Sequence, residues 1–438
     1  MQFVPNILFA IALIAGVGFF VRNIKKLTRN INLGKDVNRA DNKPIRLKNM
    51  LKIALGQYKM VRRPLSGILH VIVYVGFIII NIEVLEIIVD GLLGTHRVFQ
   101  GFLGDAFYGF LIGTFEILAA LVFITVVIFW TRRNVANIKR FLSKEMEGWP
   151  KKDGNLILYF EMVLMTLFIV MNATDLPFQQ AGVGNPISQF LAPMFSDFSA
   201  ESLHLVERAA WWIHILGILV FLNYLYYSKH LHILLAFPNT YFANLNPKGQ
   251  FNNLESVTKE VKLMMDPNAD PYANPEPGTE EEVPEKFGAS EVTDLNWVQL
   301  MNAYTCAECG RCTSACPANL TGKKLSPRKI MMDTRDRLEE VGRNIDANNG
   351  TFKDDGKQLL NDYISPEELW ACTSCNACVE ECPVSIDPLS IIMDMRRYLV
   401  MEQSAAPQEL NAMMSNIENN GAPWQYNQQD RLNWVNEE

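Results

Sequence analysis

The sequence predicts an all-α membrane protein, in which five transmembrane helices are followed by a mostly α-helical two-cluster module. Three observations predict this class. Five apolar runs fall before residue 230, the rest of the chain is polar and acidic, and all eight cysteines lie in that polar part. At 438 residues the chain is too long for one ordinary domain. We expect a membrane domain (1–238), a polar linker (239–292), a cysteine-rich module (293–400) and a tail (401–438).

The apolar runs have about the length of membrane-spanning helices. They cover residues 3–21, 65–82, 107–130, 156–171 and 209–227. A spanning helix needs about 17–25 residues, so the short fourth run must extend into its flanks. The first run has no basic leader and no small-residue cleavage site, and basic residues follow it. It is therefore expected to be a retained anchor rather than a signal peptide.

Basic loops predict the orientation of these helices. Thirteen Lys and Arg against two Asp lie between the first and second runs, and seven more basic residues lie between the third and fourth. The positive-inside rule places both loops in the cytoplasm. The N-terminus is then outside, and the cysteine-rich module faces the cytoplasm of a bacterial-type inner membrane. Because basic residues crowd near the membrane, the sequence gives no support for nucleic-acid binding.

The segment 44–64, in the first cytoplasmic loop, mixes apolar and basic residues at roughly helical spacing. It suits either a helix lying on the inner membrane face or an amphipathic loop.

Histidines occur at both ends of the apolar stretch HILGILVFLNYLYYSKHLH. On one helix, His214 and His232 share a face about 27 Å apart, and His230 points to nearly the opposite side. Ionisable residues inside a membrane are usually functional, so the pair suggests ligands to two stacked haems. His70, near the cytoplasmic start of the second helix, matches His232 in depth. The alternative is interfacial histidines with satisfied hydrogen bonds.

The outer haem would need a partner for His214. His96 and His204 are the candidates, and His96 is favoured. Three carboxylates, Glu116, Glu83 and Glu86, fall in or near the spans. They could relay protons to a quinone, or they could be structural.

The second and fifth spans, with GILHVIVYVGF and KHLHIL, resemble the cytochrome b subunit of respiratory nitrate reductases and its heterodisulfide-reductase relatives. That family holds two b haems between its second and fifth helices. The resemblance implies haem ligation by His70, His214 and His232. A second histidine is expected about ten residues after His70, where this chain has Ile80. One b haem is therefore expected, and a second would lack a ligand from the second helix.

The strongest motif is a doubled CxxCxxCxxxCP run, CAECGRCTSACP and CTSCNACVEECP. In two-cluster ferredoxins the fourth cysteine of each run binds the other cluster. The predicted ligand sets are Cys306, Cys309, Cys312 and Cys382 for one [4Fe-4S] cluster, and Cys372, Cys375, Cys378 and Cys316 for the other. A zinc site uses paired CxxC knuckles and does not need this doubled run.

About fifty residues between the runs include two Ser-Pro helix starts. This insert resembles the α-helical ferredoxin of heterodisulfide-reductase iron-sulfur subunits, and a compact βαβ ferredoxin is the alternative. The tail resembles a segment that precedes a CCG-type catalytic domain in larger fused relatives. Trp424 and Trp434 in it are expected to anchor a partner rather than to pack on the module.

Together these patterns predict a membrane electron-transfer subunit with no catalytic residues of its own. Electrons would pass between a cytoplasmic partner and the quinone pool through two [4Fe-4S] clusters and haem b. The expected partners are a CCG-domain catalytic subunit and an electron-transferring flavoprotein. The alternative is a haem-free, membrane-anchored ferredoxin that docks a redox or assembly partner.

Overall fold

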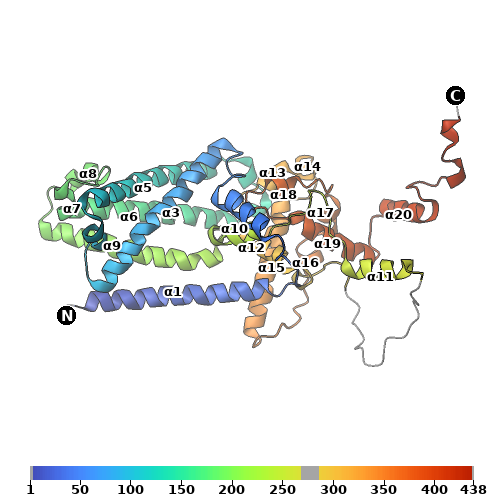
Figure 1. The fold of residues 1–438 in the computed structure, drawn as a ribbon, viewed down its shortest axis with the longest axis horizontal. Helices are drawn as coiled ribbons and strands as arrows, with labels where there is room; N and C mark the ends of the chain where they lie inside the picture. Colours follow the sequence, from blue (N-terminus) through green and yellow to red (C-terminus); the bar gives the residue numbers. More distant parts are fainter. Residues whose placement is uncertain (1–2, 268–285, 437–438) are drawn as a thin grey trace.

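The computed structural model describes residues 3–267 and 286–436. Within them the chain is helical, and its only β-structure is two isolated bridges. A helix bundle forms one end of the molecule and the cysteine-rich module forms the other (Figure 1). Five helices are long and apolar enough to cross a membrane. They are α1 (Val4–Ile31), α3 (Pro64–Leu93), α5 (Asp105–Asn134), α6 (Trp149–Thr174) and α9 (Ala200–Tyr224). The predicted fold class is confirmed.

The five long helices pack as a closed ring. Helix α3 packs on α5, α5 on α6, α6 on α9, and α1 on both α9 and α3. Buried apolar side chains such as Phe115 and Phe168 fill the half of the bundle that lies away from the module, which we call its outer half. Helix α1 is mostly exposed, but its Phe9 ring lies 5.4 Å from the Trp211 ring and fills the space beside Gly91 of α3. The ring of contacts therefore positions all five spans.

The fourth and fifth spans are longer than their apolar runs. Helix α6 has 26 residues, which is enough to cross a bilayer. Helix α9 begins at Ala200 because the Ser199 side chain accepts a hydrogen bond from the backbone N–H of Ser202 and caps it. A helix cap, rather than hydropathy, fixes this start.

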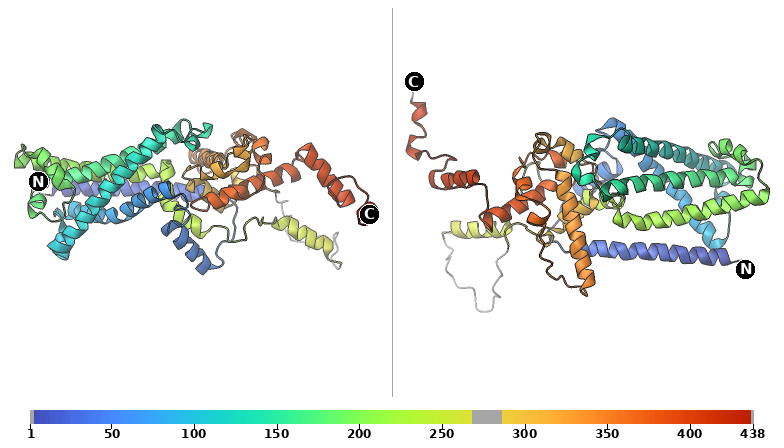
Figure 2. Two further views of the ribbon diagram at one scale, coloured as in Figure 1. Left: turned by 90° about the horizontal axis from the view of Figure 1, so that it is seen from above. Right: turned by 180° about the vertical axis from the view of Figure 1, so that it is seen from behind.

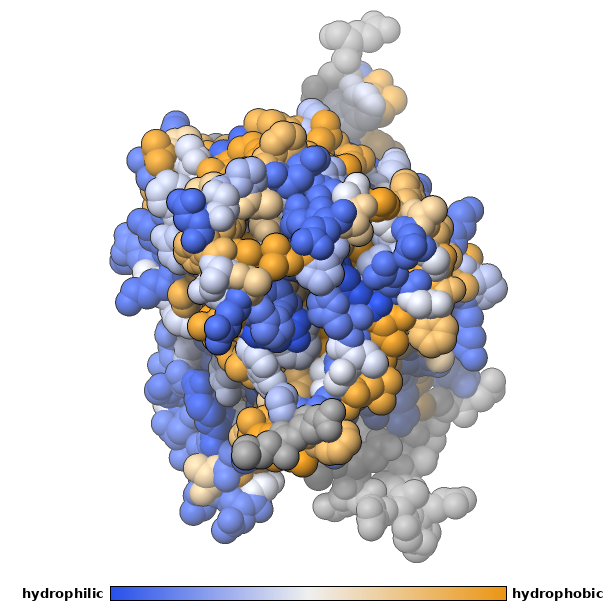
Figure 3. Space-filling view, turned by 90° about the vertical axis from the view of Figure 1, so that its left-hand side faces the viewer, coloured by the Kyte–Doolittle hydropathy of each residue, from blue (hydrophilic) through white to orange (hydrophobic). Residues whose placement is uncertain are grey.

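Short helices cover the outer end of the bundle. These are α4 (Val98–Leu103), α7 (Leu176–Ala181) and α8 (Ser188–Leu191). Figure 3 looks onto the end that carries α7 and α8, where polar side chains occupy much of the surface with apolar ones among them. This mixture suits an end of the bundle that meets water.

The segment that follows α1 is helical on the module side of the bundle. Helix α2 (Lys43–Met50) continues into one π-helical turn, Leu51–Leu55. The Arg46 guanidinium is buried and donates a hydrogen bond to the Ala243 carbonyl (2.9 Å). Several large apolar side chains remain exposed: Ile45, Leu47, Leu51 and Leu55. An exposed apolar face beside basic residues suits a helix lying on a membrane surface.

The prediction that one helix carries both His214 and His232 is wrong. Helix α9 ends at Tyr224, the backbone is extended at Ser228, and a new helix, α10 (His232–Tyr241), begins at the second histidine. The Asp153 carboxylate accepts hydrogen bonds from the Tyr224 hydroxyl (2.5 Å) and from the amide that follows Ser228 (3.1 Å). These contacts stabilise the break, although the sequence there has no Gly or Pro.

The module is a set of short helices around one long helix. They are α12 (Trp297–Thr305), α13 (Arg311–Ala315), α14 (Pro317–Leu320), α15 (Pro327–Ala347), α16 (Leu359–Asp362), α17 (Pro366–Trp370), α18 (Ala377–Glu381) and α19 (Pro388–Met401). Residues 286–436 contain no strand, so the helical alternative is correct and the βαβ alternative is wrong. One apolar cluster joins Leu27 of α1 and Leu231 to module residues such as Leu300. The module and the bundle therefore share a core.

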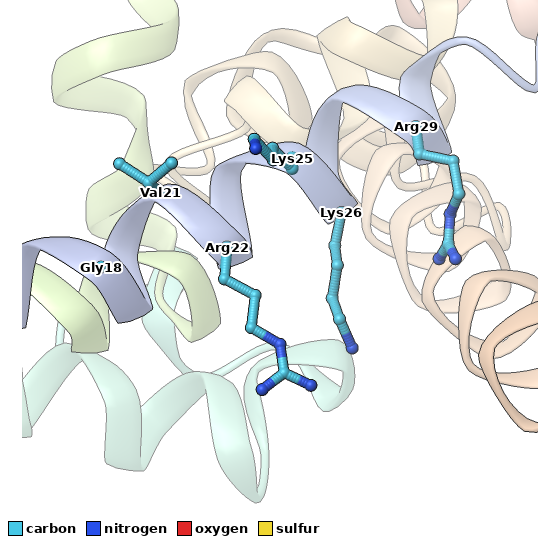
Figure 4. Close-up of a pocket in the computed structure, with 6 residues that line it drawn as sticks. All are labelled: Gly18, Val21, Arg22, Lys25, Lys26 and Arg29. Atoms are coloured by element: carbon cyan, nitrogen blue, oxygen red, sulfur yellow. The ribbon is translucent and has the colours of Figure 1, made fainter. Parts of the chain in front are cut away.

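The basic end of α1 docks on the module. Figure 4 shows Arg22, Lys25, Lys26 and Arg29 projecting from its last turns around a shallow hollow. Lys26 Nζ lies 2.7 Å from Asp346 Oδ2 of α15, and Arg29 binds the same carboxylate. This hollow is not lined by any of the cysteines or histidines.

The predicted linker is only partly irregular. It contains α11 (Glu255–Met265), and residues 268–285 lie outside the described residues. Residues 286–292 already belong to the module, because the Ala289 amide donates to the Asp394 carbonyl (3.0 Å) and Val292 is buried. The module therefore begins before residue 293.

The tail projects away from the module. Helix α20 (Gln408–Asn420) and residues 421–436 extend from the body of the molecule in all three ribbon views (Figures 1 and 2). The side chains of Trp424 and Trp434 are 62% and 70% exposed. They do not pack on the module, which leaves them free to contact another protein.

Candidate functional site

The two cysteine runs fold alike. In the first, Glu308 and Gly310 have positive φ angles of 52° and 71°; in the second, Ser374 and Asn376 at the same positions have 56° and 62°. Each left-handed pair bends the chain before a short helix, α13 or α18, and these two helices pack on each other. The doubled motif is thus a structural repeat.

The repeat brings cysteines of different runs together. A cavity is lined by Cys306, Cys309 and Cys312 of the first run and also by Cys382 and Cys378 of the second. Conversely, Cys316 of the first run lies near Cys372 and Cys378 of the second. The fourth cysteine of each run therefore lies near the other run, as crossed ligation requires.

The thiols form no disulfides, since all eight cysteines are free. Among the described residues, no three His, Cys, Asp or Glu side chains are close enough to hold a single metal ion. Burial raises the pKa of Cys306 to about 12 and that of Cys382 to about 11, so these thiols need bound iron to ionise at neutral pH. The Ile386 amide donates to Cys382 Sγ (3.2 Å), a contact of the kind that tunes clusters.

The rings of His70 and His232 lie close together at the module end of the bundle. Their ring centres are 6.4 Å apart. Two imidazoles that bind one metal from opposite sides, each through a bond of about 2 Å, have ring centres roughly 6 Å apart. The predicted pairing therefore fits a metal between the two rings.

Hydrogen bonds orient two of the histidines. Nδ1 of His232 lies 2.9 Å from the Lys229 carbonyl, and Nδ1 of His214 lies 3.0 Å from the Leu164 carbonyl. When Nδ1–H donates in this way, Nε2 is left free as a ligand. Nδ1 of His70 is buried and has no hydrogen-bond partner.

The expectation that His230 points away from His232 is wrong. Because the helix breaks before it, the His230 ring lies 5.5 Å from the His232 ring and 5.4 Å from Phe221. Its Nε2 is 3.8 Å from a carboxylate oxygen of Glu161. Three histidines, not two, therefore gather at this end of the bundle.

The structure does not place His96 or His204 beside His214. His214 is fourteen residues into α9, so it lies about 21 Å from the outer end of that helix. His96 follows the outer end of α3, is 46% exposed, and has Nε2 3.2 Å from Asp175 Oδ2. The His204 side chain is 75% exposed. The mid-helix depth of His214 differs from the near-surface position expected from the sequence.

Two of the three membrane carboxylates have hydrogen-bond partners. Glu116 accepts from the Asn172 amide group (3.0 Å) and from the backbone N–H groups of Ile187 and Ser188 (both 2.9 Å). Glu86 accepts from the Phe99 amide and the Tyr108 hydroxyl (both 2.9 Å). The structural alternative fits these two residues.

The third carboxylate, Glu83, is buried, and its Oε2 has no partner. It is the carboxylate that best fits the proton-relay alternative.

Charged residues that lie next to the first cysteine run were not predicted from the sequence. Glu308 is buried between Lys229 and Arg335, with Arg335 Nη1 2.7 Å from its Oε1. Burial opposes its charge, but the two cations outweigh burial and lower the pKa of the carboxyl. Arg311 is also buried. The motifs themselves show the difference that could have been noticed. Glu308 and Arg311 in CAECGRC are charged, whereas CTSCNAC has Ser374 and Ala377 at the same positions.

Comparison with known proteins fits this geometry. Residues 305–386 match the family model described as a 4Fe-4S dicluster domain. The module is a 4Fe-4S dicluster domain. No solved structure matches this chain.

Two curated proteins match most of the chain. The chain is 30% identical to the probable iron-sulfur-binding oxidoreductase FadF of Bacillus subtilis, over 98% of this chain and 61% of that protein. It is 25% identical to the EtfAB:quinone oxidoreductase of Syntrophomonas wolfei, over 92% of this chain and 55% of that protein. The chain thus spans little more than half the length of these relatives.

Other similar proteins match the cluster-binding part. A probable membrane-anchored ferredoxin of Chromohalobacter salexigens is 32% identical over 34% of this chain and 24% of its own length. One subunit of a CoB-CoM heterodisulfide reductase of Methanosarcina acetivorans is 30% identical over 27% of this chain and 60% of its own length. The homologues are iron-sulfur oxidoreductases and heterodisulfide-reductase-like subunits. The finer resemblance to a nitrate-reductase cytochrome is not shown by these matches.

Proposed function

We propose that this chain is a membrane electron-transfer subunit that passes electrons between a cytoplasmic partner and the quinone pool through two [4Fe-4S] clusters and one b haem. The observation that carries the haem is the close pair His70 and His232, which would hold it between their rings. The crossed arrangement of the eight cysteines supports the clusters. The histidine pair and the first cysteine run lie where the module meets the bundle.

In this proposal the chain binds the cofactors, orients them and keeps water away. The groups it holds supply one-electron transfer, and their potentials depend on ligands, hydrogen bonds and burial. His70 and His232 would hold the haem, and the Lys229 carbonyl fixes the ring of His232. The cysteine sets are those of the crossed pattern. A second haem on His214 is not part of the proposal, because His96 is held by Asp175.

The partners follow from the chemistry of the exchange. A quinone takes up two electrons and two protons to become a quinol, so the cytoplasmic partner must lose two electrons in the same turnover. A reduced flavin of an electron-transferring flavoprotein, or a dithiol of a CCG-domain subunit, can supply them. The EtfAB:quinone oxidoreductase and the heterodisulfide reductase subunits among the relatives support these two partner classes. The exposed Trp424 and Trp434 of the tail would contact the partner.

We also propose that the module lies in the cytoplasm and the N-terminus outside. The basic residues of α1 and of the loops at the module end support this orientation.

A haem-free, membrane-anchored ferredoxin is the second candidate, favoured by the similarity to the membrane-anchored ferredoxin. The reduced-minus-oxidised absorption spectrum of the purified chain separates the two. The first proposal expects the α-band of a b haem together with iron-sulfur absorbance. Iron-sulfur absorbance without that band would refute the haem and favour the second candidate.

A further inference from the structure

One hydrogen-bonded bridge joins the first cysteine run to His232. The Lys229 carbonyl lies 2.9 Å from Nδ1 of His232. The ammonium group of the same lysine binds the carboxylate of Glu308, which lies between Cys306 and Cys309. Lys229 and Glu308 are both largely buried. A single lysine thus connects the histidine to the loop between two cluster cysteines.

A second bridge joins the same run to His70. Arg311, between Cys309 and Cys312, donates hydrogen bonds to the carbonyls of Lys59 (2.9 Å) and Met60 (2.8 Å). These carbonyls precede α3 and pack against its first turns, since a Cβ on Gly67 would lie 2.8 Å from the Met60 oxygen. Gly67 is about one helical turn before His70. The bridge therefore ends next to the second histidine.

The second cysteine run lacks both connecting residues. Ser374 and Ala377 occupy the positions of Glu308 and Arg311 in the repeat. Beside Cys372 the cation is Arg396 of α19, which donates to the Leu369 carbonyl (2.6 Å) within the module. Other cations on this run, such as Lys59, Arg62 and Arg63, bind Val379, Glu380 and Glu381, next to Cys382, which the crossed pattern assigns to the first-run cluster. Of the eight cysteines, only Cys375 is exposed. The two runs have the same backbone but different surroundings.

We infer that the first-run cluster exchanges electrons with the haem at His70 and His232, and that the second-run cluster meets the cytoplasmic partner. Glu308 and Arg311 are positioning residues that hold the first run against the histidine pair. The inference rests on the proposed function. Electrons move singly, so iron at the first run is oxidised as iron at the histidines is reduced, and no bond or proton is exchanged between them.

Charge makes the inference testable, because the reduced form of a cluster or haem is the more negative one. The guanidinium of Arg311 is close enough for its charge to act on Cys309, Cys382 and His70. It should therefore raise the reduction potentials of both the first-run cluster and the haem. Glu308, beside Cys306, should lower the potential of the same cluster. Arg396 acts on Cys372 and should affect only the other cluster.

The experiment is a redox titration of the purified full chain, with the clusters followed by electron paramagnetic resonance and the haem by absorbance. Arg311→Gln is expected to lower the midpoint potentials of one cluster and of the haem. Glu308→Gln should raise the midpoint of that same cluster. Arg396→Gln, the matched control, should lower the midpoint of the other cluster and leave the haem unchanged. Arg311→Lys keeps the charge and should restore the wild-type values.

A haem midpoint that shifts with Arg396→Gln and not with Arg311→Gln would overturn the order of the clusters. If Arg311→Gln and Glu308→Gln shifted the midpoint potentials of two different clusters, the inference that both residues act on the first-run cluster would be overturned. If Arg311→Gln does not fold, Glu308→Gln and Arg396→Gln make the same comparison between clusters. Missing haem or cluster signals in the wild-type chain would instead refute the proposed function.

Discussion

Two imidazoles on different helices define the proposed haem site. His70 lies in the second turn of α3 and His232 begins α10, and the break at Ser228 is what brings their rings close together. The proposal therefore gives the two histidines the same haem.

Replacing either histidine should therefore abolish the same spectral signal. His70→Ala and His232→Ala are each expected to remove the b-haem band, because a haem held by one axial histidine loses its low-spin spectrum. His204→Ala, at an exposed position, is the matched control and should retain the band. Absorption spectra of the three purified variants make the comparison. If His70→Ala and His232→Ala each removed a different signal, shared ligation would be excluded.

Cys382 tests the crossed pattern of cluster ligation. It lines the cavity formed by Cys306, Cys309 and Cys312, although it ends the other run. Cys382→Ser should disturb the paramagnetic resonance signal that Cys309→Ser also disturbs, and Cys375→Ser should alter the other signal. Electron paramagnetic resonance of the reduced variants decides the matter. If Cys382→Ser and Cys375→Ser disturbed the same signal and Cys309→Ser disturbed the other, crossed ligation would be contradicted.

Local patterns in the sequence point to most of the residues in the proposed sites. The cysteine sets follow from spacing, and His70 and His232 follow from hydropathy and depth. Contacts between distant residues could not be predicted. Lys229 and Glu308 are 79 positions apart, and the break at Ser228 depends on Asp153 of another helix. The position of His230 was missed for that reason, because a continuous helix would have turned it away.

At the scale of elements, the contact between α1 and α15 holds the module against the bundle. A Cβ on Gly342 of α15 would lie 2.5 Å from the amide of Asn30, a buried side chain of α1 that donates to the Tyr304 hydroxyl (2.9 Å). Only a glycine lets the two helices approach this closely. Helix α1 therefore anchors the module as well as spanning the membrane.

The variant Gly342→Ala should loosen this contact. The added methyl group would displace Asn30 and cost about 1–3 kcal/mol of stability. Gly18→Ala on α1 is the control, because nothing lies within 4 Å of the position of its new Cβ. Thermal unfolding of the purified chain is expected to show a lower Tm for Gly342→Ala only. Equal Tm values for both variants would mean that the helices do not need this close approach.

The orientation of the helices gives another prediction at this scale. The basic residues at the module end of α1 and in the loops beside it favour the cytoplasmic side. A fluorescent protein that folds only in the cytoplasm should fluoresce when it is fused after residue 438, and should stay dark when it is fused before residue 1. The opposite result would contradict the proposed sidedness.

At the scale of the whole molecule, the bundle and the module act as one unit. They share an apolar core, and charged residues connect them beside the first cysteine run. The class of fold could be predicted from the sequence, because the apolar runs and the cysteine motifs are each contiguous. The shared core could not, since it joins residues that are hundreds of positions apart. In the proposed function, this junction would keep the cofactors at a fixed distance for electron transfer.

The most direct test of the account is the rate at which a quinone oxidises the reduced clusters of the purified chain, measured by rapid mixing in the wild type and in His70→Ala. If electrons reach the quinone through the haem, cluster oxidation should be many-fold slower in His70→Ala, while the cluster content is unchanged. Equal rates in the two proteins would contradict a path through the histidine pair.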